Sequence, residues 1–476
     1  MLPVFVTLYA ISSLWAILSI LLYGNRPERS IGWILIVIIL PILGVVLYIL
    51  FGINRKKFKF FKLNFTAKRR LYDSEKSNNN EWNTFEYDFS RKDFEDIGKL
   101  IRKSSGFSPL AGNKVNLLKD GEAVYNCMMD TFKKAEKFIH LQYYILEDGK
   151  IFDALTKIFE EKIKQGVEIR VLYDALGSFG LKNKSIRKLK KLGVTIFPIL
   201  PLKVNTILST LNFRNHRKIV IIDGAIAFTG GVNISDKYLF AKASPFGIWD
   251  DLHLKIEGPC VDHLHRIFIK DYYFASNKHM IEGDHYLPKQ NKKGNSVVQI
   301  VAGGPDLKYE SILHQYTSMV QCANKSIFIE NPYFIPNQTL LEALKMAALK
   351  GVDVQIMIPR NNDSKLAKYS MFKNFENLLE TGVKIHVLKN RFSHSKLIII
   401  DKQLASVGSG NFDYRSFEHN YEVNTLLYDE ALAKELALDF ENDIKNCKTL
   451  NYDSFKQRPL SYKLLEGAAK IFSPLL

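Results

Sequence analysis

The stretch that decides the fold reads His216-Arg-Lys-Ile-Val-Ile-Ile-Asp223, and it is followed by Gly230-Gly-Val-Asn233. A second copy reads His394-Ser-Lys-Leu-Ile-Ile-Ile-Asp401, is followed by Gly408-Ser-Gly-Asn411, and keeps the same spacing throughout. In each copy the His and the Lys stand two residues apart at the start of an apolar run, so their side chains project from one face of a strand. One His-x-Lys alone is typical of an ordinary surface strand, but two copies with one spacing indicate a paired site.

The residue types of this doubled motif suit the chemistry of a phosphate ester. Imidazole is a nucleophile when neutral and an acid when protonated, and its ordinary pKa of about 6.5 allows both near neutral pH. Lys and a later Asn on the same face add cationic and neutral hydrogen-bond donors for phosphate oxygens. Two histidines can therefore supply two different roles at one phosphorus atom.

Sequence around the two motifs is also repeated. Each copy contains Gly-Val pairs that follow a Lys- or Glu-rich amphipathic stretch, so the glycine predicts a helix C-cap and the β-branched run after it a buried strand. The alternation predicts an α/β fold built from two homologous lobes, each with a central mixed sheet flanked by helices. The paired segments are Ala135 to Ile145 with Ala323 to Ile335, Gly166-Val with Gly351-Val, and Gly193-Val with Gly382-Val.

Length and composition narrow the class of protein. The chain has 476 residues, 47% of them hydrophobic, which excludes a single small module and a disordered chain. Its 66 Lys and Arg against 49 Asp and Glu give a net charge of +17, which indicates an anionic partner such as nucleic acid, acidic lipid or a phosphate ester. The four cysteines are far apart, which argues against a disulfide framework and a structural zinc site.

The N-terminal region contains two uncharged runs, Met1 to Tyr23 and Ile31 to Gly52. Each is long enough to cross a bilayer as a helix, and the first lacks the basic start and small-residue cleavage site of a secretory signal. We therefore expect a two-helix transmembrane hairpin at residues 1–53. The stretch from Asn54 to Arg70 holds eight Lys and Arg and no acid, so the positive-inside rule places the large C-terminal part in the cytoplasm, together with the N-terminus.

Residues 54–92 are predicted to form a basic juxtamembrane segment and a polar linker. Four phenylalanines alternate with the cations between Asn54 and Arg70, a mixture typical of a segment that lies on a membrane surface. A solvated stop-transfer tail or a nucleic-acid patch remains an alternative. At the other end of the chain, the apolar spacing from Tyr462 to Leu476 suits an amphipathic helix, which either core docking or membrane contact would explain.

The doubled pattern resembles that of the phospholipase D superfamily, and the whole chain most resembles the bacterial cardiolipin synthases. Further similar stretches are Arg26 to Trp33, Trp249-Asp-Asp-Leu-His253, Pro332-Tyr-Phe-Ile-Pro336, and Arg415-Ser-Phe417 with Asn420-Tyr-Glu-Val-Asn424. The resemblance implies lobes at residues 93–285 and 297–476 with a linker at 286–296. It also implies phosphatidyl transfer between two phosphatidylglycerol molecules through a phosphatidyl-histidine, which gives cardiolipin and glycerol.

By this resemblance the candidate catalytic residues are His216, Lys218, Asp223, His394, Lys396 and Asp401. His216 is assigned as the nucleophile and His394 as the acid and then the base, although the reverse assignment stays open. The lysines, with Asn233 and Asn411, are expected to hold the phosphate oxygens without a metal or another cofactor. Asp223 and Asp401 are expected to orient neighbouring backbone rather than to touch the substrate.

Each histidine also needs a carboxylate that orients its second nitrogen. Glu422 lies 28 residues after His394 and is the expected partner in the second lobe. Asp251 lies 35 residues after His216 and is the candidate in the first lobe, with Asp250 as a competitor. Tyr333 and Phe334 are expected either to line the entrance or to belong to the core.

Three other functions remain as alternatives. A membrane-anchored phospholipase D or a phosphatidylserine-type synthase would use water or serine in place of the second lipid hydroxyl. A membrane-tethered nucleic-acid-binding protein would also explain the basic charge. The hairpin anchor favours a lipid substrate, so the expected partners are phosphatidylglycerol and anionic membrane lipids rather than nucleic acid, and the expected location is the cell membrane with several spans.

Overall fold

The computed structural model describes residues 2–24, 27–40, 42–53, 89–201, 212–277, 279–389 and 391–473. Within these residues the strands are β1 (Leu110–Leu118), β2 (Phe138–Tyr143), β3 (Glu168–Asp174), β4 (Thr195–Ile199), β5 (Ile219–Ile222), β6 (Ile226–Gly230), β7 (Trp249–Asp250), β8 (His253–Glu257), β9 (Ser296–Gly303), β10 (Ser326–Glu330), β11 (Asp353–Pro359), β12 (Lys384–Leu388), β13 (Phe392–Ser393), β14 (Leu397–Ile400), β15 (Leu404–Gly408), β16 (Glu422–Tyr428) and β17 (Cys447–Thr449).

The helices of the same described ranges fall into an N-terminal group and a group that covers the sheet. The N-terminal group is α1 (Leu2–Tyr23), α2 (Pro27–Ile39), α3 (Leu43–Leu47) and the π-helical turn η1 (Tyr48–Gly52). The second group is α6 (Lys92–Ser105), α7 (Gly121–Lys133), α8 (Lys150–Lys164), α9 (Asn183–Leu192), α11 (Cys260–Ala275), α12 (Ser311–Gln321), α13 (Gln338–Leu349), α14 (Lys365–Glu380), α15 (Tyr414–Glu418), α16 (Glu430–Ile444), α17 (Tyr452–Lys456) and α18 (Leu460–Ile471).

One mixed sheet of 15 strands runs through the body in the described part of the chain, in the order β17-β12-β11-β10-β14-β15-β16-β9-β1-β8-β6-β5-β2-β3-β4. The strand order is similar on both sides of the β1–β9 junction. On each side two antiparallel strands come first, then a β-hairpin, and then three parallel strands. The predicted α/β fold with mixed sheet is confirmed. The two central sheets expected from the repeat are joined into one, because β1 and β9 pair antiparallel.

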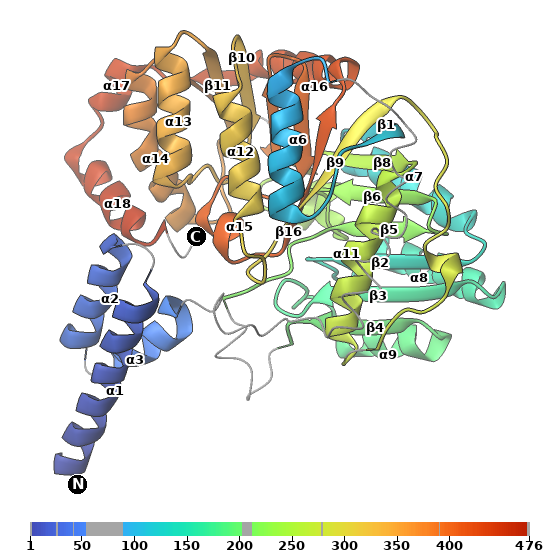
Figure 1. The fold of residues 1–476 in the computed structure, drawn as a ribbon, viewed down its shortest axis with the longest axis horizontal. Helices are drawn as coiled ribbons and strands as arrows, with labels where there is room; N and C mark the ends of the chain where they lie inside the picture. The colour runs from blue at the N-terminus through green and yellow to red at the C-terminus, as the bar shows by residue number, and fades with distance from the viewer. Residues whose placement is uncertain are drawn as a thin grey trace.

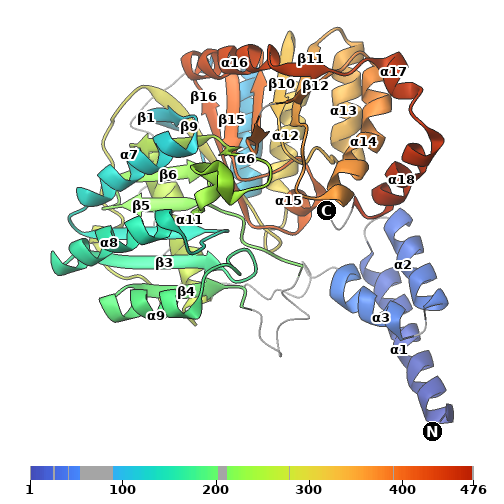
Figure 2. The same ribbon diagram turned by 180° about the vertical axis from the view of Figure 1, so that it is seen from behind.

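Helices cover the sheet in two layers that bury three apolar cores. Figure 1 shows α12, α13 and α14 in front of the C-terminal half of the sheet (β9–β17), and Figure 2 shows α7 and α8 on the opposite side, over the N-terminal half (β1–β8). These two layers each bury a separate core, whereas α11 and α16 contribute to a third core that extends across both halves. The strands that carry the motifs, β5 and β14, are therefore buried on both faces.

The glycines of the repeated Gly-Val pairs end helices, as predicted. Gly193 is the C-cap of α9 with φ 102°, and β4 begins two residues later. Gly166, Gly351 and Gly382 also have positive φ, each between a helix and a strand. This left-handed conformation costs glycine little, so the residue ends the helix and releases the chain into the strand.

The second apolar run of the N-terminal region does not form one long helix. Its first part, α2, ends at Ile39, two residues before Pro41 in the sequence, and Ile42 has φ 64° before α3 begins. Proline cannot donate the helical hydrogen bond and disfavours helix in the residue before it, which explains the interruption. Among the described residues one helix, at Val6–Tyr23, is long and apolar enough to cross a membrane.

The interrupted run folds back on itself beside α1. The Tyr9 hydroxyl donates to the carbonyl of Val37 (3.0 Å), and Ser19 and Tyr48 hydroxyls lie 2.9 Å apart. Trp33 packs edge-on against Tyr48, with ring centroids 5.8 Å apart. Thus α2 runs away from the body along α1, and α3 with η1 returns toward the body.

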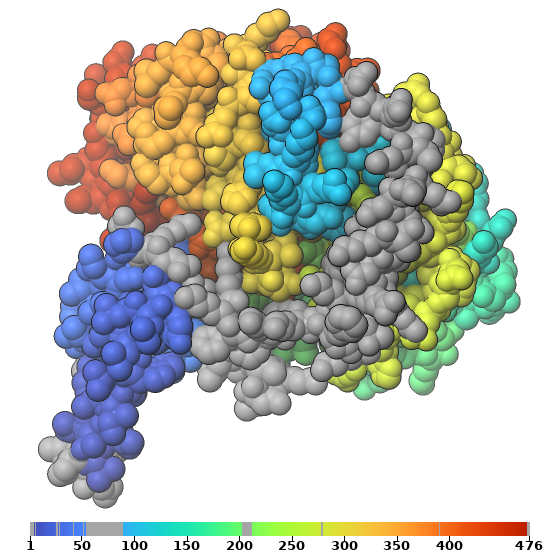
Figure 3. Space-filling view, in the orientation of Figure 1, coloured from blue at the N-terminus to red at the C-terminus, as the bar shows by residue number. Residues whose placement is uncertain are grey.

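The N-terminal helices project from the body at one end, as the space-filling view shows (Figure 3). Arg29, near the start of α2, pairs with Glu418 of α15 (2.6 Å), and its guanidinium lies 5.1 Å from the ring centroid of Tyr414. The start of α2 therefore faces the body. The predicted basic segment and linker fall almost wholly in residues 54–88, outside the described residues.

Candidate active site

The two histidines of the doubled motif are held by backbone from opposite halves of the sheet. His216 lies three residues before β5, and its backbone N–H donates to the carbonyl of Tyr421 (2.9 Å), next to β16. His394 follows β13, which pairs in parallel with β7, and its backbone N–H donates to the carbonyl of Asp250 (2.7 Å). Each imidazole is therefore positioned where the N-terminal and C-terminal halves meet.

The imidazole of His216 forms a dyad with Glu422, the first residue of β16. Its Nδ1 lies 3.0 Å from Oε2 of Glu422 and 3.0 Å from the carbonyl oxygen of Ser409. Both neighbours accept hydrogen bonds, so we assign the proton of the neutral ring to Nδ1. The Nε2 atom then carries the free electron pair.

The carboxylate of Glu422 is held in its ionised form by further donors. The Ser409 hydroxyl donates to Oε2 (2.5 Å), while the Ser416 hydroxyl (3.0 Å) and the Asn420 amide (3.3 Å) donate to Oε1. Burial alone would raise the pKa of Glu422, but His216, Lys218 and Ser409 outweigh it and hold this pKa below its ordinary value. Glu422 is thus a fixed negative charge behind His216.

The imidazole of His394 forms the corresponding dyad with Asp251. Its Nδ1 lies 2.7 Å from Oδ2 of Asp251, but also 2.9 Å from Nζ of Lys396, which is a donor. Burial raises the pKa of Asp251 to about 6, against the opposing charges of Lys396 and Lys218. A proton on Asp251 would donate to Nδ1 and leave the ring proton on Nε2, so this dyad has a second protonation pattern that the His216 dyad lacks.

The pairing of acids and histidines predicted from the sequence is wrong. We expected Glu422 to orient His394 and Asp251 to orient His216, within each lobe, whereas the two acids are exchanged across the sheet. The reason lies in the backbone contacts between the halves. The residue before His216 pairs with Tyr421, next to Glu422, and β13, which precedes His394, pairs with β7, next to Asp251. Asp250 does not compete for His394 through its side chain, because its carboxylate pairs with Arg391 (2.8 Å).

Both motif lysines are buried beside the histidines. Nζ of Lys218 donates to the carbonyl of His216 (2.7 Å), and Nζ of Lys396 donates to that of His394. Burial lowers the pKa of Lys218 to about 7 and also lowers the pKa of Lys396. Burial and then the charges of Lys396, Lys218 and His216 lower the pKa of His394 well below its ordinary value. An anion bound among these groups would restore their charges.

The two motif asparagines differ in their contacts. The Asn233 amide donates to the Tyr238 hydroxyl (3.2 Å), and its oxygen accepts from the N–H of Ile145 (3.1 Å). The oxygen of Asn411 is buried and has no hydrogen-bond partner in the described ranges.

Asp223 and Asp401 lie after β5 and β14, at the ends away from the histidines. The carboxylate of Asp223 accepts three backbone N–H groups just before and at the start of β2, from residues 136–138 (2.7–2.8 Å). Asp401 accepts the equivalent groups of residues 324–326 before β10, as well as Arg91 (2.6 Å). Both carboxylates fix the start of the neighbouring strand, in the orienting role expected for them.

The comparisons with known proteins agree over almost the whole chain. Residues 128–274 and 316–444 match the family described as "Cardiolipin synthase, PLD-like domain", and residues 11–52 match "Phospholipase_D-nuclease N-terminal". The cardiolipin synthase of Geobacillus sp. (strain WCH70) is 38% identical over 96% of this chain and 90% of its own. That of Geobacillus kaustophilus (strain HTA426) is 36% identical over 100% of this chain and 94% of its own. The chain belongs to the cardiolipin synthase family.

A solved structure shows that this family member shares its fold with another lipid enzyme. The phosphatidylserine synthase of Haemophilus influenzae Rd KW20 superposes with a TM-score of 0.59, covering 81% of this chain and 100% of that chain at 16% identity. At this identity the likeness concerns the fold alone.

The structure adds site residues that sequence reasoning missed in this cardiolipin synthase family member. The ring of Tyr144 meets His216 edge-on, with centroids 4.7 Å apart, and Tyr333 meets His394 in the same way at 6.3 Å. Phe334 is buried in the core instead. In the repeat Tyr144 corresponds to Pro332, one residue before Tyr333, and this proximity was the signal for it. Ser416 and Asn420 lie in stretches that resemble the family, but sequence reasoning assigned them no role, because only the fold shows that both donate to Glu422.

Proposed function

We propose that the chain is a cardiolipin synthase that transfers a phosphatidyl group from one phosphatidylglycerol to a hydroxyl of a second. Its family membership makes it a phosphatidyltransferase. The observation that carries the proposed mechanism is the pair of buried His-carboxylate dyads with two lysines between the sheet halves. These groups supply a nucleophile, a proton donor and a cationic phosphate site.

In the first step Nε2 of His216 attacks the phosphorus of a phosphatidylglycerol. The new bond joins Nε2 to phosphorus, and the bond between phosphorus and the glycerol oxygen breaks. His394 gives its Nε2 proton to that oxygen while its Nδ1 takes the proton of Asp251, so glycerol leaves neutral. Glu422 stabilises the imidazolium that forms at His216.

In the second step a headgroup hydroxyl of another phosphatidylglycerol gives its proton to Nε2 of His394, whose Nδ1 returns a proton to Asp251. Its oxygen attacks phosphorus, the bond from phosphorus to His216 breaks, and cardiolipin leaves. Lys218 and Lys396 stabilise the phosphate oxygens throughout, with Asn411 beside them and Asn233 supporting the loop. The atoms balance as two phosphatidylglycerols in, and cardiolipin and glycerol out.

The different protonation patterns of the dyads support this assignment of roles. His216 has two acceptors at Nδ1, so its Nε2 is free to attack. At His394, Lys396 donates toward Nδ1 and burial raises the pKa of Asp251 to about 6, so a proton can reside on Nε2 facing the leaving group. We therefore propose His216 as the nucleophile rather than the reverse.

The acceptor is tested by the identity of the products. Purified full-length protein in vesicles of phosphatidylglycerol should release one glycerol for each cardiolipin formed, as measured by mass spectrometry. Phosphatidic acid from phosphatidylglycerol alone would indicate a phospholipase D. Phosphatidylserine on addition of serine, without cardiolipin in its absence, would indicate the serine-using alternative.

We propose that the catalytic part consists of two phospholipase D-like lobes, at residues 93–285 and 297–476, with a linker at 286–296. Residues 1–53 anchor the protein in the cell membrane, residues 54–92 lie at its cytoplasmic surface, and the lobes are cytoplasmic. The basic stretch after Ile53 supports this orientation. The lipid partners are then phosphatidylglycerol and other anionic lipids of the inner leaflet.

The fold-back of α3 and η1 favours one transmembrane span with a re-entrant second run. Both charged loops then lie on the body side, and the N-terminus lies across the membrane. In the alternative, the second run opens into the second span expected from the sequence, and the N-terminus stays with the body. A membrane-impermeant maleimide should label Leu2→Cys in intact cells, whereas wild-type chain should stay unlabelled. Protection of Leu2→Cys until the cells are opened would support the two-span hairpin.

A further inference from the structure

The last helix, α18, presents its apolar residues to solvent and its polar residues to the protein. Leu460, Leu464 and Ile471 lie along one face and are 71%, 65% and 76% exposed. Leu465 and Phe472 widen the same exposed face. An ordinary surface helix has the opposite arrangement, with its apolar stripe toward the core.

The polar side of α18 is locked onto the body by specific contacts. The Ser473 hydroxyl, just past the helix, lies 2.6 Å from that of Ser370 in α14, and Lys470 donates to Asn374 one turn further along α14. Glu466 is buried and pairs with Arg458 (2.6 Å). These contacts fix the rotation of α18 about its axis, so the outward direction of the apolar face is a property of the fold.

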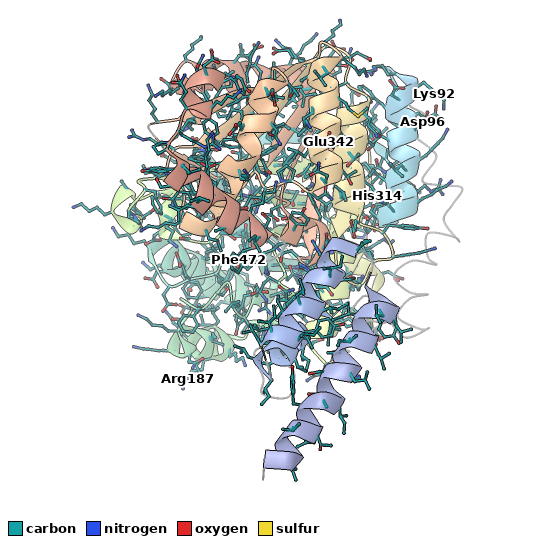
Figure 4. The ribbon with its side chains drawn as sticks, turned by 90° about the vertical axis from the view of Figure 1, so that its left-hand side faces the viewer. Lys92, Asp96, Arg187, His314, Glu342 and Phe472 are labelled. Carbon is teal, nitrogen blue, oxygen red and sulfur yellow. The ribbon has the colours of Figure 1, made fainter. Side chains whose placement is uncertain are left out.

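The exposed face lies at the end of the body from which the apolar N-terminal helices project. Figures 1 and 2 show α18 beside the body-facing end of α2, and Figure 4 places Phe472 at the same level. This is the end of the N-terminal helices where Arg29 contacts Glu418. A bilayer crossed by α1 would therefore have its surface close to α18.

Charge at the edge of the apolar face matches an anionic lipid surface. Lys463 and Lys470 are seven residues apart, so they lie on the same edge of the helix, and both are partly exposed. Lys470 donates to Asn374 and Lys463 lies 4.0 Å from Glu376, so their contribution to a lipid surface is positive charge at its edge, and either side chain would leave its present contact to reach a phosphate headgroup. The acids nearby, Glu376 and Glu466, are both paired with Arg458, and Glu376 also lies within ion-pair distance of Lys463.

We infer that α18 lies in the interface of the anionic bilayer, with Leu460, Leu464 and Ile471 inserted at the boundary of headgroups and acyl chains. The inference rests on the membrane anchoring proposed above. It gives the catalytic body a second attachment, so the two sheet halves keep one orientation toward the lipid surface from which the substrates come.

Single labelled positions in the full-length protein test this contact independently of catalysis. Ile471→Cys and the control Leu349→Cys, on α13 and 71% exposed, each receive an environment-sensitive NBD fluorophore in phosphatidylglycerol nanodiscs. The fluorophore at position 471 should emit at shorter wavelength and lose most of its emission to doxyl-labelled lipids, whereas that at 349 should not. The wild-type chain, taken through the same labelling, corrects for the four native cysteines.

Two results would overturn the inference. Equal, weak quenching at positions 471 and 349 would leave α18 in water. A short-wavelength signal at 471 that doxyl lipids do not quench, and that cross-linking assigns to a second copy, would make the face a dimer interface. In either case the variants would still form cardiolipin if the proposed reaction is right, so failure of this inference is separable from failure of the proposed function.

Discussion

The two dyads, His216 with Glu422 and His394 with Asp251, come from one repeated motif but differ in the surroundings of the acid. Glu422 accepts from three side chains besides the histidine and keeps a lowered pKa. Asp251 faces a lysine that also approaches His394, and its pKa is raised to about 6. The same motif therefore fixes a proton in one copy and leaves it movable in the other, which is what a nucleophile and an acid each need.

One motif position contributes to this difference between the two acids. The second copy has Ser409, whose hydroxyl donates to Glu422, where the first copy has Gly231. At Gly231 a side chain would collide with the Asp251 carboxylate, so glycine makes room for that acid. The change from Gly231 to Ser409 thus supplies one of the three extra donors to Glu422, beside Ser416 and Asn420.

Removing either imidazole should have the largest effect. His216→Ala and His394→Ala should each lower the rate of cardiolipin formation by about 10⁴-fold or more, because the two rings act as a unit. Radiolabelled phosphatidylglycerol in vesicles measures the rate, and circular dichroism with membrane fractionation checks folding and insertion. Near-normal activity in either variant would break the two-histidine scheme.

Replacing the acid of each dyad by its amide should lower kcat to different extents in the two dyads. Glu422→Gln removes the fixed charge behind the nucleophile and should lower kcat by about 100-fold to 1,000-fold. Asp251→Asn should cost about tenfold, since Lys396 still contacts His394. Steady-state kinetics on mixed micelles gives both values. A greater loss in Asp251→Asn than in Glu422→Gln would favour the reverse assignment of roles.

The motif position that differs between the copies provides a smaller test. Ser409→Ala removes one hydrogen bond to an ionised carboxylate and should lower kcat by about tenfold. Alanine is preferred here to the glycine of the first copy, because glycine would also loosen the backbone. If Ser409→Ala left kcat unchanged, the extra donor would not account for the difference between the dyads.

The pH dependence should show the smallest change. Since the pKa of Lys218 is lowered to about 7, its positive charge in the free protein is present below that pH and is lost as pH rises through it. The value of kcat/KM reports the free enzyme, so it should fall about fivefold between pH 7 and pH 8. A profile on phosphatidylglycerol micelles that stays flat from pH 6 to pH 9 would contradict this.

Local features of the site were predictable from the sequence, whereas its long-range partners were not. The Lys of each motif stands immediately before β5 or β14, as alternation and the β-branched runs predicted. The repeat also predicted equivalent sheet halves around the two motifs. It suggested partners within each half, and the exchange of Glu422 and Asp251 depends on how the halves meet, which no local pattern records. The second apolar run shows the same limit. Its length and hydropathy predicted a continuous helix, but the helix ends at Ile39, just before Pro41 in the sequence.

The most direct test of His216 as the nucleophile is to locate the phosphatidyl group on the protein. His394→Ala, stopped shortly after it meets phosphatidylglycerol, should carry a phosphatidyl adduct on the peptide that contains His216, as identified by tandem mass spectrometry. His216→Ala should carry none. An adduct on His394 in His216→Ala, with none on His216 in the other variant, would contradict the assignment of the nucleophile and the interpretation of the two dyads on which it depends.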